Sequence, residues 1–311
     1  MHLIGQPDKL PLHPHTVGDA GGGMIGVMSE SRPPTPPDVA RELRRRSGFG
    51  CCRCGLPVVQ YHHIVPWHIE EHFRVEDMMA LCPYCHDAAT KGALNEAAQR
   101  RYQAEPHNVR TGHSSGALFV NQSYVAVAFG GALLVGDGAR ITIDDVELLK
   151  LGVSPDGELA LSVELHDSGG ETLAIIDRNE WIIGNPDVWD MRADHDRLKI
   201  WSAERKIALQ LDARATPVFV RANLWHEGYL VRLSASGISW GEAKIDNGGI
   251  QDLGLVGVSL EVSSAEKSVK IVSNAERGML VSEPDPVERL SKSVNAWRRL
   301  QGGAGGGALL T

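Results

Sequence analysis

Two closely spaced Cys-x-x-Cys pairs constrain the fold of this chain more than any other feature of its sequence. They are Cys51/Cys54 and Cys82/Cys85. Each pair offers two thiolates from one tight turn, and four thiolates are the ligand set of a tetrahedral structural zinc. The spacing therefore predicts a segment folded around one zinc ion. Cys52, the remaining cysteine, is expected to be a bystander beside the first pair.

Cysteine usage also indicates a compartment. All five cysteines lie within residues 51–85, whereas a secreted disulfide framework would spread them along the chain. The N-terminus lacks the basic region and apolar core of a signal peptide, and no apolar run is long enough to span a membrane. We therefore expect a cytoplasmic protein with no membrane partner.

Histidines stand beside the cysteines. His62 and His63 lie between the two pairs, and His86 follows the last cysteine directly. If the thiolates hold a structural metal, these imidazoles are left for a second, working metal or for proton transfer near neutral pH. His68 and His72 lie between them and the second pair, and we expect both at the surface.

The segment resembles the HNH endonuclease family, in the branch whose ββα-metal motif is held by a four-cysteine zinc. The resemblance rests on Cys-x-x-Cys-Gly at 51–55, His-His-Ile-Val-Pro at 62–66 and Leu-Cys-Pro-Tyr-Cys-His at 81–86, and it covers roughly residues 38–112. It implies a β-hairpin folded onto a helix. It also implies a metal-dependent endonuclease that hydrolyses DNA phosphodiester bonds.

The resemblance assigns roles to single residues. His62 and His86 would bind the catalytic metal, and His63 would be the general base that activates water. Mg²⁺ is the default ion by availability, although imidazole ligands also suit Mn²⁺, Ni²⁺ or Zn²⁺. The family's asparagine, five residues before the third cysteine, is Asp77 here, and we expect its carboxylate to act in catalysis by orienting a histidine ring. A last ligand found in some members is replaced by Thr90, which predicts modest activity.

Several local elements and contacts are also predicted. We expect a helix over residues 38–47, a strand over 58–61, a helical leg from 76 to 81, a helix from 92 to 103 and a linker over 106–115. Cations near the metal centre are candidate phosphate contacts. These DNA-binding candidates are Arg44, Arg45, Lys91, Arg100 and Arg101.

Charge and texture change along the chain. Residues 1–113 carry 12 Lys+Arg and 12 Asp+Glu, whereas residues 114–311 carry 19 and 27. A domain that grips DNA by its phosphates should be basic, which argues against a DNA clamp in the second part. From Gly116 onward, short alternating apolar runs punctuated by Gly, Asp and Asn predict an all-β, sandwich-like domain. Trp181, Trp189, Trp201 and Trp225 are expected to pack in its core or at its edges, with an aromatic ligand site as the alternative.

Together these patterns predict an α+β multidomain protein. Its parts are a disordered segment (1–37), the HNH domain (38–112), the β-rich domain (113–283), a C-terminal helix (284–301) and a disordered tail (302–311), with translation starting at Met1 or Met28. We expect DNA as the substrate, with RNA possible, and a β domain that targets or regulates the nuclease through a ligand or protein partner. The alternative is a catalytically inactive zinc module that binds nucleic acid or protein.

Overall fold

The computed structural model describes residues 32–116, 118–119, 123–182, 188–242, 245–273 and 278–303. Residues 35–311 form one compact unit. The segments predicted to be disordered fall largely outside the described residues, as does the candidate start at Met28. No helix in the described part of the chain has the length and apolar character needed to cross a membrane.

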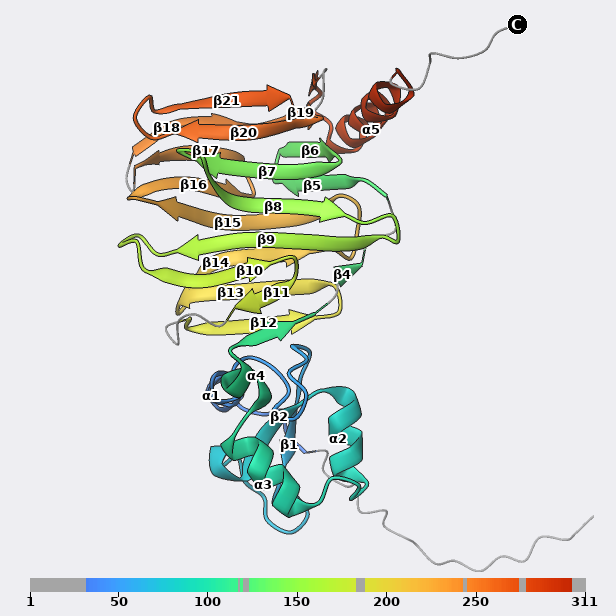
Figure 1. Ribbon diagram of the computed structural model, residues 1–311, viewed down its shortest axis with the longest axis vertical. Coiled ribbons are helices and arrows are strands. Elements are labelled where there is room, and N and C mark those ends of the chain that lie inside the picture. The colour runs from blue at the N-terminus through green and yellow to red at the C-terminus, as the bar shows by residue number, and fades with distance from the viewer. Residues whose placement is uncertain are drawn as a thin grey trace, which may run out of the picture. The chain divides into compact units, whose positions relative to one another are not determined.

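The first part of the unit is small and mostly helical (Figure 1). Its elements are α1 (Pro37–Arg46), β1 (Gln60–His63), η1 (Val75–Asp77), β2 (Met78–Leu81), α2 (Pro83–Thr90), α3 (Glu96–Ala104) and α4 (His107–Thr111). Strand β1 pairs antiparallel with β2, with His63 opposite Met78, and α2 follows directly. This arrangement confirms the predicted β-hairpin folded onto a helix.

The predicted helical leg at residues 76–81 is wrong. The chain makes one 3₁₀ turn and then enters β2, in which all four residues are buried. Four consecutive buried apolar residues suit a strand covered on both faces as well as they suit a helix, and pairing with β1 decides between the two. The helix begins at Pro83, where proline fits because the first helical N–H needs no partner.

Residues 106–115 are also more ordered than the predicted linker. They form α4 and β3 (His113–Ser115), and Gly112 ends α4 in a left-handed conformation with φ of 79°. Asn108 is fully buried and donates from Nδ2 to the carbonyls of Gly48 (3.1 Å) and Gly55 (3.0 Å). This side chain ties α4 to the backbone around the first cysteine pair.

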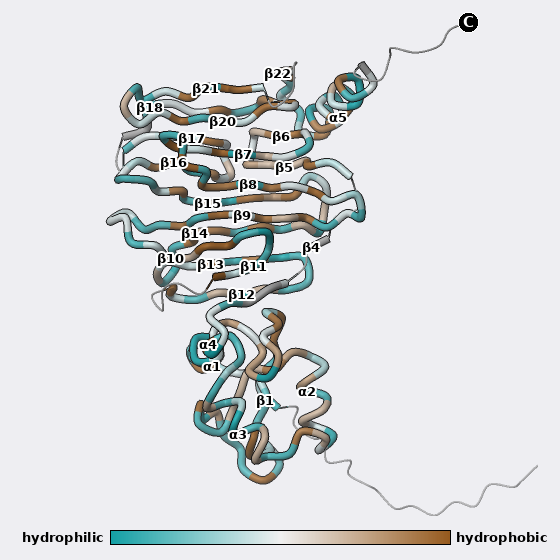
Figure 2. Tube along the Cα trace, viewed as in Figure 1, coloured by the Kyte–Doolittle hydropathy of each residue, from teal (hydrophilic) through white to brown (hydrophobic). Residues whose placement is uncertain are grey.

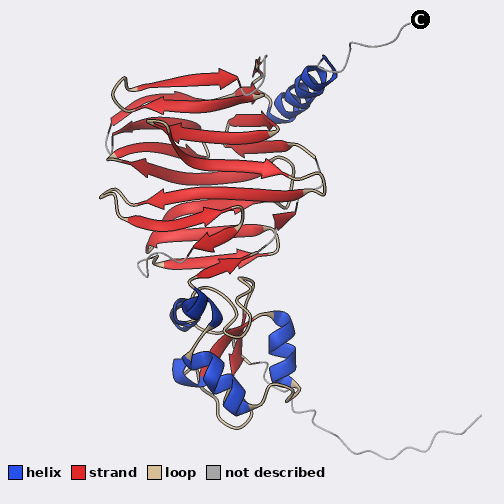
Figure 3. Ribbon diagram, viewed as in Figure 1, coloured by secondary structure: helices blue, strands red, loops and turns tan. Residues whose placement is uncertain are grey.

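The described residues that follow α4 form strands and one helix, as predicted, and Figure 3 shows the change from blue helices to red strands. The strands that follow β3 are β4 (Leu118–Phe119), β5 (Val125–Phe129), β6 (Ala132–Gly136), β7 (Gly138–Ile143), β8 (Val146–Val153), β9 (Glu158–His166), β10 (Thr172–Asp177), β11 (Glu180–Ile182), β12 (Asp190–Asp194), β13 (Arg197–Ala203), β14 (Lys206–Asp212), β15 (Val218–His226), β16 (Tyr229–Ser234), β17 (Gly237–Glu242), β18 (Ile245–Ile250), β19 (Leu253–Val256), β20 (Val258–Ser263), β21 (Ser268–Ser273) and β22 (Met279–Ser282). We call strands β3–β22 the β region.

Two sheets make up the β region. One runs β21-β20-β7-β8-β9-β10-β11-β3, and the other runs β12-β13-β14-β15-β5-β6-β19-β22 with β16, β17 and β18 added beside β15. Most neighbours are antiparallel. Three pairs are parallel and join distant parts of the chain, namely β5 with β15, β6 with β19 and β7 with β20.

The core of the β region lies between these sheets. In β9 every second residue from Leu159 to Leu165 is buried, and its partners in the same apolar cluster include Val127 and Leu134 from the other sheet. Alternating burial on both sheets is the pattern of a sandwich, and brown apolar residues recur along the strands in Figure 2. The helix α5 (Pro286–Gly303) packs Val294 and Trp297 against residues of β5, β6 and β19.

A buried ion pair joins α1 to strand β12. Arg44 donates from Nε to Asp190 Oδ1 (2.8 Å) and from a terminal nitrogen to Oδ2 (2.6 Å), and both side chains are almost completely buried. Arg44 also donates to the Tyr61 hydroxyl, one residue before His62 on β1. Nearby, Arg41 lies over the ring of Trp189 at 4.5 Å. Arg44 therefore links the β region to the strand that carries the histidine doublet.

Candidate active site

The four cysteines converge on one point. Their sulfur atoms all lie within 4.8 Å of one another, with Cys54 at 3.7 Å from Cys82 and 3.9 Å from Cys85. Tetrahedral zinc with bonds of about 2.3 Å requires sulfur separations of about 3.8 Å. Within the described residues this is the one group of three or more Cys, His, Asp or Glu that could hold a metal. The thiols therefore fit the predicted structural zinc.

Protonation of these thiols depends on a cation. A hydrogen bond with Cys54 lowers the pKa of Cys51 to about 5, the same bond raises the pKa of Cys54, and burial raises the pKa of Cys85 to about 12. Hydrogen bonding between the thiols and burial therefore penalise the thiolate forms of Cys54 and Cys85. A dication removes this penalty, because it stabilises thiolates directly.

Two neighbours of the cluster differ in role. Cys52 is 3% exposed, and burial raises its pKa to about 12, so it is a neutral core thiol outside the ligand set, as expected. Arg53 was not singled out from the sequence. Its guanidinium lies 3.9 Å from Cys85 Sγ and offsets negative charge on the sulfurs. A cation between the two cysteines of a knuckle is the sequence signal that would have found it.

The ββα arrangement brings His62 and His86 together. His62 lies on β1 and His86 on the first turn of α2, with ring centroids 5.1 Å apart and ring planes nearly perpendicular. Both rings are half-buried. Two imidazoles at this spacing are a partial ligand set for a divalent ion, and nitrogen ligands suit Mn²⁺, Ni²⁺ or Zn²⁺ better than Mg²⁺.

His63 is held in one tautomer. Its ring is 4% exposed, and Nε2 lies 2.9 Å from the backbone carbonyl of His72. A carbonyl oxygen only accepts, so Nε2 carries the proton, and Nδ1 is the basic nitrogen of the neutral ring. The ring also packs edge-on against Trp67 (5.4 Å) and His72 (5.1 Å). The His63 ring thus has a fixed orientation, and it belongs to the residue that directly follows His62 on β1.

Comparison with protein families supplies the assignment. Residues 51–92 match the family model of the HNH endonuclease. This segment is an HNH domain. Comparisons with curated proteins and with solved structures found no match. The matched range contains both cysteine pairs and all three histidines discussed above.

The predicted surface position of His72 in the HNH domain is wrong. His72 is 7% exposed, donates from Nε2 to the Val65 carbonyl at 3.1 Å, and accepts at Nδ1 from the Arg74 amide at 3.2 Å. The ring therefore fills the interior of the loop that follows β1 and satisfies its backbone. His68, in the same loop, is exposed as expected.

Asp77 of the HNH domain binds arginines. Its carboxylate accepts from Arg74 Nε (2.8 Å) and Arg100 (2.8 Å), and these bonds, Arg74 first, hold its pKa below the usual range. The His72 carbonyl, and not the Asp77 carboxylate, is the acceptor that fixes the His63 tautomer. The backbone carbonyl of Asp77 does support the site, because it accepts from the Ile64 amide at 2.8 Å, directly after His63.

Thr90 lies one helical turn beyond His86. Its hydroxyl donates to the His86 carbonyl at 2.9 Å, and the side chain is exposed. A hydroxyl that caps its own helix in this way is a poor metal ligand. The HNH domain therefore offers two imidazoles where some members of the family are expected to offer three ligands.

The cations expected to contact phosphates fall into two groups. The proposal for Arg44 is wrong, because its guanidinium is buried against Asp190, and Arg100 is engaged with Asp77. Arg45 and Arg101 are exposed, and Lys91 is exposed beside Asp87. A cluster of arginines in one helix does not reveal which of them is turned inward.

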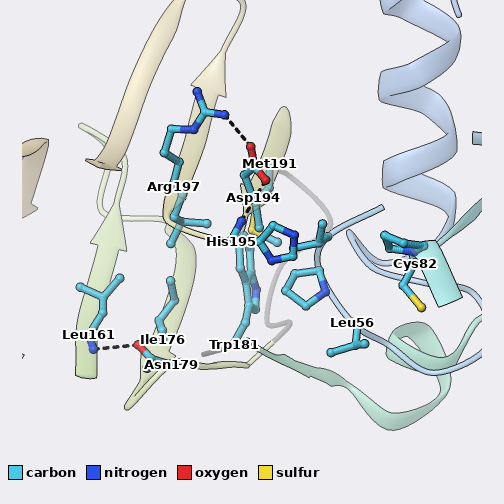
Figure 4. Close-up of a pocket in the computed structure, with 16 residues that line it drawn as sticks. Leu56, Cys82, Leu161, Ile176, Asn179, Trp181, Met191, Asp194, His195 and Arg197 are labelled. Atoms are coloured by element: carbon cyan, nitrogen blue, oxygen red, sulfur yellow. Dashed lines mark hydrogen bonds and ion pairs between the residues drawn. The ribbon is translucent and has the colours of Figure 1, made fainter. Parts of the chain in front are cut away.

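An apolar cavity lies elsewhere. It encloses about 260 Å³ between the first cysteine knuckle and the β region, and Figure 4 shows Leu56 and Cys82 on one side with Trp181 and Met191 on the other. Its polar rim is formed by Asp194, His195 and Arg197. His62, His63 and His86 do not line it, so phosphodiester chemistry does not belong to this cavity.

Proposed function

We propose that this protein is a metal-dependent endonuclease whose HNH domain hydrolyses DNA phosphodiester bonds, while its β region targets or regulates the cut. The observation that carries this proposal is the fixed tautomer of His63. A purely structural zinc module has no need to orient a basic nitrogen on the residue that directly follows a candidate metal ligand.

The chemistry follows from the protonation of His63. Nδ1 takes a proton from the attacking water, and the imidazolium that forms is stabilised by its Nε2–H bond to the His72 carbonyl. The aromatic rings of Trp67 and Phe73 enclose the base and limit its access to bulk water. A divalent cation bound by His62 and His86 would supply Lewis-acid stabilisation of the leaving oxygen.

The nature of the substrate rests on the family and on charge. HNH nucleases act on nucleic acids, and exposed Arg45, Lys91 and Arg101 offer cations to a phosphate backbone near α1, α2 and α3. Cleavage of a DNA duplex and of an RNA with the same sequence, measured side by side, tests the choice of DNA. A cytoplasmic location is supported by the five cysteines, none of which forms a disulfide.

The second candidate is a catalytically inactive zinc module. It is favoured by the burial of His63 and by the replacement of two family positions with Asp77 and Thr90. In that case the zinc and the hairpin would only present a binding surface.

Plasmid cleavage in Mg²⁺, Mn²⁺ or Ni²⁺ separates the two candidates. The parent should cut, and His63→Ala should lose about 10²- to 10⁴-fold in rate, as expected for removal of a general base. His68→Ala removes an exposed histidine from the loop that follows β1, and this variant should cut like the parent. Zinc content and thermal unfolding must match in all three proteins. Absence of cutting by the parent in every metal would favour the binding module.

A further inference from the structure

A polar hollow of about 520 Å³ opens on the β region, away from the HNH domain's own residues. It is lined by the turn between β9 and β10, the turn between β13 and β14, and the facing parts of β15 and β16. None of its lining residues comes from residues 37–111, and nothing in the proposed mechanism uses it.

The hollow is basic within an acidic part of the chain. Arg205, Lys206, Arg221 and Arg232 line it, against one carboxylate, that of Asp167. The charge balance of the hollow is therefore opposite to that of residues 114–311, which carry 19 Lys+Arg and 27 Asp+Glu. The Asp167 carboxylate accepts from two amides of its own turn, those of Gly169 (2.8 Å) and Glu171 (3.0 Å).

Three of the cations, Arg205, Lys206 and Arg221, have exposed side chains that a ligand can reach. Arg221 and Lys206 are exposed, and no ion pair within the described residues involves either of them. Arg205 makes one long contact of 3.9 Å with Glu204, and both side chains are largely exposed. Exposed pairs of this kind contribute little and are readily exchanged for a phosphate.

A tryptophan lies on the same strand face as Arg221. Arg221, Asn223 and Trp225 are alternate residues of β15 and share one face of that strand, and Arg232 of β16 is paired directly with Asn223. Trp225 is half-buried and lines the hollow. Two arginines and an indole therefore project from adjacent strands into one hollow.

We propose that this hollow binds a single-stranded nucleic-acid segment, with the arginines and Lys206 on its phosphates and Trp225 stacked on a base. Positively charged grooves with an aromatic platform are how proteins hold single strands without reading sequence, and the guanidinium suits phosphate because it binds through two N–H groups. A duplex would leave Trp225 without a base to contact. The proposal rests on the proposed function, since it places part of the nuclease's substrate on the β region.

The test measures binding without cleavage, using the full chain with His63→Ala and no added divalent cation. A fluorescent oligothymidylate and a duplex of equal length serve as probes over a range of salt. Lys206→Gln/Arg221→Gln should weaken single-strand binding about tenfold at low salt and reduce the salt slope by about 0.7 for each phosphate that the variant no longer neutralises. Trp225→Leu should weaken it further at unchanged slope, and Trp225→Phe should restore part of the affinity.

Lys270→Gln, which removes an exposed cation from β21, is the matched control and should leave binding unchanged. The proposal would be overturned if the hollow variants (Lys206→Gln/Arg221→Gln and Trp225→Leu) bound single strands as tightly as the parent. It would also be overturned if Lys270→Gln weakened binding as much as they do, or if the protein preferred the duplex. Plasmid cleavage with His63 intact is scored separately. If the parent cuts plasmid but the hollow variants bind single strands normally, only this inference fails. If the hollow binds single strands as expected but the protein never cuts, only the nuclease proposal fails.

Discussion

At the scale of single residues, two histidines nine positions apart divide one task. His72 uses both ring nitrogens to hold the loop after β1, and its carbonyl then fixes the tautomer of His63. The catalytic proposal therefore depends on a residue that never needs to touch substrate. The backbone carbonyl of His72, rather than a carboxylate side chain, orients the His63 ring.

Replacing His72 tests this division. His72→Ala should free the loop from the Val65 carbonyl and the Arg74 amide, which lets the His72 carbonyl drift from His63. Misplacement of a reacting group by about 1 Å costs about 100-fold. We expect kcat to fall by up to that factor while zinc content and KM stay near those of the parent. Single-turnover cleavage checks the rate. If His72→Ala had the same kcat as His68→Ala, the positioning role would be contradicted.

The sequence predicts these residues unequally. The four thiols, His62, His63 and His86 follow from spacing, because each knuckle is local and its ligand types are distinctive. The burial of His72 could not be predicted, since its partners are backbone atoms that come within reach only when the loop closes. Arg44 was placed on the surface for a related reason. Its partner Asp190 lies far along the chain, in another element.

At the scale of elements, the two Cys-x-x-Cys pairs stabilise the ββα unit in place of a larger apolar core. Around the sulfurs, the small apolar cluster consists of residues such as Ile64, Met79, Leu81 and Leu94. It shares no residue with the core of the β region. The stability of the ββα unit should therefore depend on metal, and that of the β region should not.

Adjacent cysteines give a matched test of this dependence. Cys51→Ala removes a ligand, and Cys52→Ala removes a buried thiol outside the ligand set, so the two variants lose the same atoms one residue apart. Cys51→Ala should lose bound zinc and cleavage, whereas Cys52→Ala should keep one zinc per chain. Elemental analysis with calorimetry checks both, and chelation should affect only the transition of the ββα unit. Zinc loss in Cys52→Ala would refute the ligand assignment.

A turn in the β region predicts a pH effect. Asp144, between β7 and β8, accepts from the Ser264 amide at 2.9 Å, and its bonds with Ser264 hold its pKa below the usual range. The folded state therefore keeps this carboxylate charged to lower pH than the unfolded chain does. Its contribution to stability is present above about pH 4 and is lost as pH falls through the folded pKa.

The measurement compares the free energy of unfolding of the β region in the parent and in Asp144→Asn. The parent should be more stable at pH 6, and the difference should shrink toward pH 2. Asp145→Asn, in the same turn, serves as the control for removing an exposed charge. A difference that does not change with pH would show that this carboxylate does not titrate with folding.

Element types were easier to predict than their pairing. Alternation gave the all-β character and the position of α5, because burial on one face follows from the side-chain period. The pairing of β5 with β15 or of β3 with β11 joins segments with no shared local signal. Strand β2 has only four residues and all are buried, so its sequence does not show the alternation of apolar and polar residues that distinguishes a strand from a helix.

At the scale of the whole molecule, one of the contacts between α1 and the β region is a desolvated charge pair. Arg44 and Asp190 are nearly inaccessible, and Tyr61 links the arginine to the strand of the histidine doublet. Removing Asp190 leaves the buried charge of Arg44 without its carboxylate, whereas Asp190 has a second, more exposed partner in Arg192 at 3.5 Å. This makes the pair a sensitive point for stability and for any influence of the β region on cutting.

Asp190→Asn should therefore cost about 3–5 kcal/mol of unfolding free energy, the usual penalty for breaking a buried pair. The double variant Arg44→Met/Asp190→Leu should recover most of that loss. Asp194→Asn on the same strand breaks an exposed pair with Arg197 and should cost less than about 1 kcal/mol. Urea denaturation measures all three. Equal effects of Asp190→Asn and Asp194→Asn would show that the buried pair is not special.

The three parallel strand pairs have a consequence for synthesis on the ribosome. Strands β5, β6 and β7 each pair with a strand, β15, β19 or β20, that is translated much later, whereas the elements from α1 to α4 are all translated by residue 111. Nascent chains fold from the N-terminus as units, and distant pairings form last. The HNH domain should accordingly be folded while most of the β region is still untranslated. Any restraint that the β region places on cutting would begin only when translation of the chain is nearly complete.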